Sequence, residues 1–441
     1  MAGATGGLTP FQRFWIAHGT SVTATGIGAF VLPILAVLEL NASAGQVGLI
    51  SAAQWIPFLF LSLPLGVVVD RVAAKPLVVS AAATRAVLAA TIATAAATGL
   101  ASVPLLMVTA LLVGGCTVVY EVTYQSYISE LVDRLTLEKA NARIQTTLAT
   151  AQIGAPGVGG ALVRWLGTAA VIGIESALHA VSAAVLATLP ADPGSPPDEQ
   201  HRFSGFTFWR PMRDTFWRQM RDGLAVLARD PYLVALAGYS AISNLFEQWV
   251  SVLVTVYALR ELDIGAAGLG LALTIGAVGA LLGAASAAWV ERRIGAGITL
   301  VSFTAVDCVA LASVSLLDPG LSSEYAIAGL SVLWFFNAIG ASATTVIALT
   351  MRQLRTPTGY LGRVNAGIRW VSYGSIAIGS ALGGLAGTLL GVRTGLTIGG
   401  LGYLLTLAWV AASPLRSVHH PEDLDLKMND SEVDGQQSGQ S

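Results

Sequence analysis

The fold of this chain is decided in the stretch Gly66-Val67-Val68-Val69-Asp70-Arg71-Val72-Ala73-Ala74-Lys75-Pro76. The apolar run before it, residues 47–69, has no charged residue, and the run after it, residues 77–100, has only Arg85. Each run is long enough to cross a bilayer as a helix, which takes about 20 apolar residues. A short charged loop with excess Arg and Lys between two such helices faces the cytoplasm. The stretch therefore predicts a membrane hairpin.

The composition of the whole chain agrees with this interpretation. Of its 441 residues, 54% are hydrophobic and 11% are charged, against about 25% charged residues in a typical soluble domain. Apolar windows of spanning length recur along the chain, so we expect an all-α membrane protein with twelve transmembrane helices. The expected spans are 12–38, 46–69, 77–99, 103–130, 140–166, 169–189, 232–259, 265–290, 298–317, 322–350, 362–390 and 393–413.

The distribution of Lys and Arg predicts the topology. Of the 24 basic residues, only Arg164, Arg260 and Arg393 fall at the outer ends of the spans if the N-terminus is inside. Basic residues concentrate on the cytoplasmic side of membrane proteins. We therefore expect a multi-pass protein of the cell inner (plasma) membrane with both termini in the cytoplasm. The N-terminus does not resemble a cleaved signal peptide.

An internal repeat divides the predicted helices into two sets of six. A shift of about 222 residues places Leu38-Glu39-Leu40-Asn41 on Arg260-Glu261-Leu262-Asp263, and a shift of 224 places Asn141-Ala142 on Asn365-Ala366. Parallel repeats of this kind build transporters from two related halves. The expected domains are a cytoplasmic N-terminus (1–11), an N-terminal six-helix bundle (12–189), a cytoplasmic linker (190–231), a C-terminal six-helix bundle (232–413) and a disordered tail (414–441).

The linker alternates aromatic and arginine residues between Phe203 and Met220, a pattern that suits an amphipathic helix at the membrane surface. Nucleic-acid binding is the rival interpretation, and beside twelve predicted spans we do not favour it. We expect the lipid bilayer to be a partner of this segment and nucleic acid not to be one.

The spacing of Gly66, Asp70, Arg71 and Lys75 between the second and third predicted helices resembles the cytoplasmic-loop signature of the major facilitator superfamily. The segments 124–132 and 138–143, with Phe14-Trp15 ahead of the first helix, resemble the macrolide- and siderophore-efflux branch of that superfamily. The resemblance implies two six-helix halves that rock about a central substrate site. It also implies that the loop acts as a cytoplasmic latch.

The fifth predicted helix carries a second resemblance, in Gly154, Pro156, Gly159 and Gly160. The pattern is similar to the helix-5 signature of drug–proton antiporters, although Ala155 stands where that signature has Gly. It favours export over import. Ordinary packing of small residues is the alternative explanation.

Ionisable residues inside predicted spans need a cavity or a partner, because each costs about 2.5–3.5 kcal/mol on insertion. The resemblance implies that helices 1, 4, 7 and 10 line the cavity, which makes Glu121 and Glu247 the candidates for proton coupling and substrate binding. Their polar or aromatic neighbours are Tyr124, Gln125, Asn244 and Trp249. An interhelical hydrogen bond that only stabilises packing is the alternative.

The remaining intramembrane ionisable residues receive structural interpretations. Glu175 and His179 are four residues apart on one helix, so we expect them to pair with each other. Asp307 falls on a helix that the resemblance makes peripheral. Arg85 is close enough to the inner helix end for its side chain to reach the membrane surface.

Together these features predict a proton-coupled exporter of a lipophilic drug, a macrolide-like or a siderophore-like molecule. An importer of a small nutrient on the same fold and a non-transporting membrane sensor or scaffold remain as alternatives. We do not expect an enzyme: the five histidines are scattered or in the tail, and no phosphate-binding loop is present. We expect no cofactor and no metal, since Cys116 and Cys308 each lie in apolar runs. A monomer is expected, with protons and a small molecule as partners.

Overall fold

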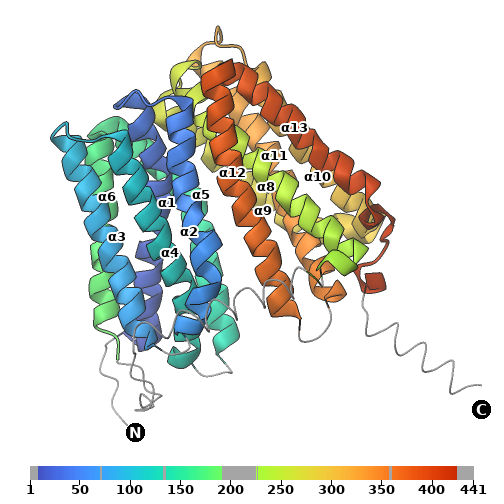
Figure 1. Ribbon diagram of the computed structural model, residues 1–441, viewed down its shortest axis with the longest axis horizontal. Helices are drawn as coiled ribbons and strands as arrows, with labels where there is room; N and C mark the ends of the chain where they lie inside the picture. The colour runs from blue at the N-terminus through green and yellow to red at the C-terminus, as the bar shows by residue number, and fades with distance from the viewer. Residues whose placement is uncertain are drawn as a thin grey trace, which may run out of the picture. The chain divides into compact units, whose positions relative to one another are not determined.

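Every regular element in the described part of the chain is helical. The computed structural model describes residues 8–69, 72–132, 136–190, 225, 227–356 and 360–424. The long helices of the first half are α1 (Pro10–Leu38), α2 (Ala44–Val69), α3 (Ala74–Ala97), α4 (Val103–Leu131), α5 (Leu137–Leu166) and α6 (Thr168–Ala187). Those of the second half are α8 (Pro231–Arg260), α9 (Gly265–Ile294), α10 (Ala296–Ala312), α11 (Ser323–Arg355), α12 (Leu361–Leu390) and α13 (Val392–Ala412) (Figure 1).

The described residues also contain three short 3₁₀ helices: η1 (Ser313–Leu316), η2 (Pro414–Ser417) and η3 (Pro421–Leu424). The predicted all-α membrane fold is confirmed. Eleven of the long helices in the described residues are long and apolar enough to cross a membrane. The remaining one is α5, whose first turns carry Glu138, Lys139 and Arg143.

The first helix of each half begins with a well-formed N-cap. The Thr9 hydroxyl accepts from the Gln12 backbone N–H at 3.2 Å, and the Gln12 side chain accepts from the Thr9 backbone N–H at 2.8 Å. At α8 the Asp230 carboxylate accepts from the backbone N–H groups of Tyr232 and Leu233. A Pro follows each cap, at the helix position where the missing N–H is not needed.

The bounds of the helices follow the repeat found in the sequence. Helices α5 and α12 each have 30 residues and begin 224 positions apart. The turn after the first helix of each half contains a left-handed residue, Asn41 at φ 48° and Asp263 at φ 47°. Asn and Asp tolerate this conformation because their short polar side chains bond locally. The repeat therefore extends from the helices to the backbone geometry of the turn.

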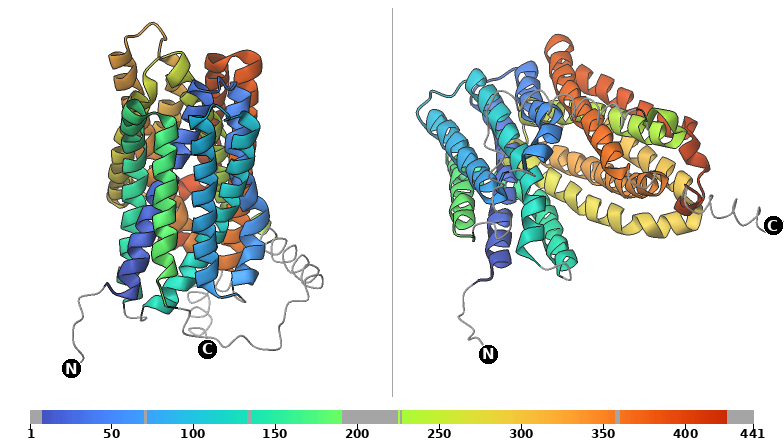
Figure 2. Two further views of the ribbon diagram at one scale, coloured as in Figure 1. Left: turned by 90° about the vertical axis from the view of Figure 1, so that its left-hand side faces the viewer. Right: turned by 60° about the horizontal axis from the view of Figure 1, so that its bottom comes forward.

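The chain divides into two compact units. One contains α1–α6 and residues 265–271 at the start of α9, and the other contains α8, the rest of α9 and α10–α13. In the first, α3 packs on α6, α2 on α4, and α1 on α5 and α6. In the second, α8 packs on α12 and α13, and α10 on α11 and α13. Figure 2 shows the helices of the N-terminal unit running side by side.

Small residues set the closeness of this packing. A Cβ on Gly114 of α4 would lie 3.0 Å from the Gln54 carbonyl carbon of α2, and one on Gly379 of α12 would lie 2.8 Å from that of Leu245 in α8. Lipid provides no hydrophobic drive between helices, so close backbone packing supplies much of the attraction. Glycine is therefore required at both places.

Two predictions fall largely outside the described residues. The predicted amphipathic segment of the linker lies within residues 191–224, and the end of the predicted disordered tail lies within residues 425–441. The start of that tail is ordered in the structure: η2 and η3 follow α13 directly, and Leu415 is fully buried. The tail boundary placed at residue 414 is thus too early, because these residues pack on the C-terminal unit.

Candidate functional site

Arg85 of α3 is the centre of a polar cluster inside the N-terminal unit. Its side chain is 2% exposed. The guanidinium donates hydrogen bonds to Ser21 Oγ at 3.0 Å and to Thr25 Oγ1 at 3.2 Å, both on α1. It also lies 4.7 Å from the centre of the Tyr120 ring. The expectation that Arg85 reaches the membrane surface is wrong, because α1 and α4 give the charge its partners inside the bundle.

His18 of α1 joins this cluster through aromatic contacts. Its ring stacks against Phe14 and Tyr120, with centroids 5.9 Å away in each case, and the Tyr124 ring lies 4.9 Å away. His18 Nδ1 is 3.3 Å from the Tyr120 hydroxyl, and His18 is 2% exposed. Nothing in the sequence pattern marks His18 as a site residue beyond its place in the first span. Tyr124 thus packs on a buried histidine.

The structure brings Glu121 and Glu175 to the same cluster from different helices. Glu121 follows Tyr120 on α4 and is half-buried, whereas Gln125 one turn later is exposed. Arg85 interacts electrostatically with both carboxyl groups. Two acidic residues that looked unrelated in the sequence therefore share one buried cation.

The predicted pairing of Glu175 with His179 is confirmed, with 3.9 Å between Glu175 Oε1 and His179 Nε2. Two serines of α6 hold this helix against its neighbours. Ser176 Oγ donates to the Ala86 carbonyl at 2.8 Å, and Ser182 Oγ donates to the Ala17 carbonyl at 2.7 Å. The pair is thus fixed between α1 and α3 and is not an isolated surface contact.

Asp307 of α10 holds the corresponding place in the C-terminal unit. It is 1% exposed and accepts hydrogen bonds from Asn337 Nδ2 at 2.5 Å and from the Tyr403 hydroxyl at 2.7 Å. Asn337 belongs to α11 and Tyr403 to α13. The expectation that Asp307 is peripheral therefore does not describe its surroundings, which are the buried interior of this unit.

The two clusters occupy equivalent positions of the repeat. Arg85 and Asp307 are 222 residues apart, on α3 and α10. His179 and Tyr403 are 224 residues apart, on α6 and α13. Each half thus has a buried ionisable residue on its third helix and a polar ring on its sixth, and that residue is basic in the first half and acidic in the second.

The candidate residues on α8, which are Glu247, Asn244 and Trp249, differ from one another in exposure and in hydrogen-bond partners. Glu247 is exposed on α8. Asn244 Nδ2 donates to the Ser240 carbonyl of its own helix at 2.6 Å. Trp249 Nε1 donates to the Gly395 carbonyl of α13 at 2.9 Å, and its ring packs closely on Gly399. Trp249 therefore joins α8 to α13.

The predicted helix-5 motif lies beside a groove between α1 and α5. The groove has a volume of about 660 Å³ and is lined by Gly154, Ala155 and several threonines of α5. Trp15 Nε1 donates to Thr147 Oγ1 at 2.8 Å within it. Its lining therefore combines an aromatic ring, hydroxyl groups and the Arg143 guanidinium, which lies 5.9 Å from the Trp15 ring.

The other members of the motif shape α5 itself. Pro156 lies inside the helix. Gly159 is buried against α1, where a Cβ would lie 3.1 Å from the Phe30 ring, and Gly160 is also buried. The positions of the motif thus differ in their packing, because Gly154 faces open space whereas Gly159 packs against α1.

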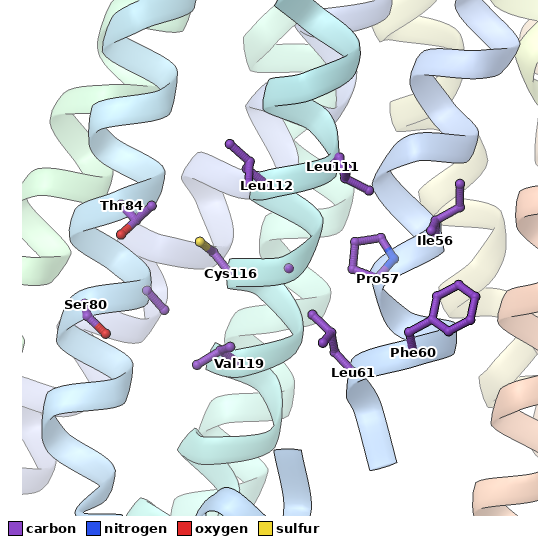
Figure 3. A pocket seen from close by; sticks show the side chains of 12 residues that line it. Ile56, Pro57, Phe60, Leu61, Ser80, Thr84, Leu111, Leu112, Cys116 and Val119 are labelled. Carbon is purple, nitrogen blue, oxygen red and sulfur yellow. The ribbon is translucent and has the colours of Figure 1, made fainter. Parts of the chain in front are cut away.

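A second pocket, of about 490 Å³, lies between α2, α3 and α4 (Figure 3). Its lining is mostly aliphatic and aromatic, with Pro57 and Phe60 on α2. The Cys116 sulfur and the hydroxyl groups of Ser80 and Thr84 are its polar side-chain atoms. Among the described residues, no group of three or more His, Cys, Asp or Glu is placed to hold a metal ion.

The predicted latch is described only in part. Asp70 and Arg71 lie outside the described residues. Gly66 lies in the last turns of α2. Lys75, at the start of α3, donates from Nζ to the Leu189 carbonyl just after α6. Lys75 therefore connects two helix ends of the N-terminal unit.

Solved structures of transporters share this fold at low sequence identity. The nucleoside transporter NupG aligns with a TM-score of 0.70 and 13% identity, over 92% of this chain and 99% of its own. A bacterial homologue of the human lysosomal transporter Spinster, in an inward-facing and unoccupied conformation, has a TM-score of 0.66 and 14% identity, over 95% and 97%. A bacterial metal transporter has a TM-score of 0.62 and 17% identity, over 92% and 98%.

The sequence itself matches one family model. No curated protein matches the chain at a significant level. The model of the Major Facilitator Superfamily matches residues 14–332, which is more than half of the sequence. The match covers α1 to α10 and the start of α11, and with it both the Arg85 cluster and Asp307. The chain is therefore a multi-pass membrane transporter, not an enzyme, and belongs to the Major Facilitator Superfamily.

Proposed function

We propose that this transporter is a proton-coupled exporter of a lipophilic small molecule, macrolide-like or siderophore-like, acting by alternating access. The observation that carries the proposal is the buried Arg85 cluster with its two carboxyl groups, Glu121 and Glu175. Ionisable groups inside a membrane protein are costly and mark ion or proton pathways. A coupled transporter needs a carboxyl group that exchanges a proton between the two access states.

The groove between α1 and α5 supports a small-molecule substrate. Its volume of about 660 Å³ falls within the roughly 300–1,000 Å³ of ligand pockets. Trp15 offers an aromatic face, and Thr147 carries one of several hydroxyl groups that can bond a polar ring substituent. Such a lining suits a bulky molecule with scattered oxygen atoms.

Outward transport is supported by the helix-5 pattern, in which Pro156 and the neighbouring glycines would set how the outer side closes. In this proposal both termini are cytoplasmic in the plasma membrane. Asp70 and Arg71, with Gly66 and Lys75, form the latch between the halves. Glu121 and Glu247 are the carboxyl groups that meet the substrate, beside Tyr124, Gln125, Asn244 and Trp249.

The experiment is ethidium efflux from cells that express the protein, with and without a protonophore. We expect efflux that stops when the proton gradient collapses. Glu121→Gln and Glu247→Gln test the coupling in the same cells, with membrane insertion measured for each variant. Efflux that continues after collapse of the gradient would contradict proton coupling. Gradient-driven uptake of a nutrient, without efflux, would instead establish an importer.

A further inference from the structure

The carboxyl group of Glu175 lies in a site that only a glycine on the facing helix permits. A Cβ on Gly28 of α1 would lie 2.6 Å from Glu175 Oε2 and closer still to Glu175 Oε1 and Cδ, so the carboxyl group rests directly on the α1 backbone. The Glu175 side chain is 13% exposed, and its neighbour His179 is 1% exposed. Position 28 therefore controls where this carboxyl group sits without contributing any polar atom of its own side chain.

A small cavity opens beside this carboxyl group. Its volume is about 30 Å³, and its polar lining consists of Glu175, His179, Thr25 and Gln54. A cavity of that size has room for a water molecule, and a buried water needs two to four polar partners. His179 supplies one such polar partner, because its Nδ1 is buried and has no hydrogen-bond partner among the described residues. The cavity thus offers a proton donor or acceptor next to Glu175.

The charges around Glu175 favour one bound proton in the cluster. Arg85 on α3 acts on Glu175, and His179 pairs with it on α6. The other titratable groups around Arg85 are His18 on α1 and Cys116, Tyr120 and Glu121 on α4. Arg85 stays charged at any physiological pH. One cation beside two carboxyl groups is neutral when one carboxyl group is protonated, and a low-dielectric interior favours the neutral arrangement.

We propose that Glu175 is the residue that binds and releases this proton in the N-terminal half. This inference rests on the proposed proton coupling. A water molecule in the cavity delivers the proton to a Glu175 oxygen and later takes it back, while Arg85 keeps its charge and compensates the carboxylate. His179 and Gly28 position the carboxyl group. Glu121 does not line this cavity.

Infrared difference spectroscopy of the purified full-length protein tests the site without any transport. The readout is the carbonyl stretch of a protonated carboxylic acid, followed as a function of pH. We expect a titrating band that Glu175→Gln removes. Gly28→Ala should shift its frequency or midpoint, since the added methyl group displaces the carboxyl group. Gly173→Ala on α6, the helix that carries Glu175, is the matched control, because a Cβ there meets no atom within 4 Å.

Ethidium efflux at several pH values separates this inference from the proposed function. We expect Glu175→Gln to lose the pH dependence, and Gly28→Ala to change it by at least severalfold, with Gly173→Ala matching the wild type. A titrating band that survives Glu175→Gln, or unchanged pH dependence in both variants, would overturn the assignment of Glu175. If the wild type shows no efflux but the band titrates through Glu175, the site stands and the proposed function fails. Gly28→Ala keeps the test valid if Glu175→Gln does not fold.

Discussion

Removal of one hydroxyl group from Tyr403 tests how firmly the Asp307 cluster holds the C-terminal unit. The Tyr403 side chain is 1% exposed, and its hydroxyl donates to Asp307 Oδ2 at 2.7 Å. Tyr403→Phe keeps the ring and its packing and removes only this bond. Asp307 would keep the bond from Asn337 at 2.5 Å. The change therefore isolates one hydrogen bond to a buried carboxyl group.

Two general ranges bound the expected loss. Hydrogen bonds to charged groups contribute about 1.5–3 kcal/mol, whereas interhelical hydrogen bonds in a membrane protein average about 0.6 kcal/mol with a maximum near 1.7. Asp307 is 1% exposed, and the Tyr403 hydroxyl lies at hydrogen-bonding distance from it. We therefore expect a loss of unfolding free energy near the upper limit for membrane proteins, about 1.5 kcal/mol. That is roughly a tenfold change in the unfolding equilibrium.

Unfolding of the purified protein in mixed micelles provides the measurement. Tyr403→Phe, Asp307→Ala and the double variant form a cycle whose coupling energy reports the bond itself, because Ala offers no acceptor to the Tyr403 hydroxyl. Tyr325→Phe is the control, because Tyr325 is 71% exposed on α11 of the same unit. A loss below about 0.5 kcal/mol, or an equal loss from Tyr403→Phe when Asp307 is already Ala, would refute the reasoning.

Two further changes test other parts of the C-terminal unit. Asp230 both caps α8 and accepts a hydrogen bond from Arg355 Nε at 2.7 Å. Asp230→Ala should therefore lower the free energy of unfolding by about 1 kcal/mol more than Asp230→Asn, which keeps the cap. Equal thermal unfolding of the two variants would contradict this. Gly379→Ala places a Cβ 2.8 Å from the Leu245 carbonyl carbon, so we expect a poor yield of monodisperse protein by size-exclusion chromatography. Gly154→Ala is the control and should match the wild type, because a Cβ at position 154 meets no atom within 4 Å.

The architecture was predictable because its signals are long and repeated. The apolar runs around Gly66–Pro76 and the near-constant shift between halves predicted the helices, and α12 begins one residue before its expected span. The partners of Arg85 were not predictable. In a membrane helix the lipid-facing side and the packed side are both apolar, so the hydrophobic pattern does not tell which way a residue points. Arg85 therefore looked like a residue near the surface although it is buried.

The same limit applies to the candidate carboxyl groups. Glu175 and His179 were predicted to pair because spacing along one helix suffices for that inference. The contact of Glu175 with Gly28 depends on how α6 packs against α1, which spacing within one helix does not contain. Asp307 depends in the same way on Asn337 and Tyr403 from two other helices.

The different residue types at the equivalent positions of Arg85 and Asp307 bear on how a duplicated architecture becomes one indivisible protein. At the moment of duplication both halves carry the same residue at this place, and either half can stand in for the other. With a cation in one half and a carboxyl group in the other, that interchangeability is gone. A chain built from two copies of the N-terminal half would bury two guanidinium groups. Exchange of halves between relatives should then succeed only when the residues that hold each charge, Ser21 and Thr25 or Asn337 and Tyr403, move with it.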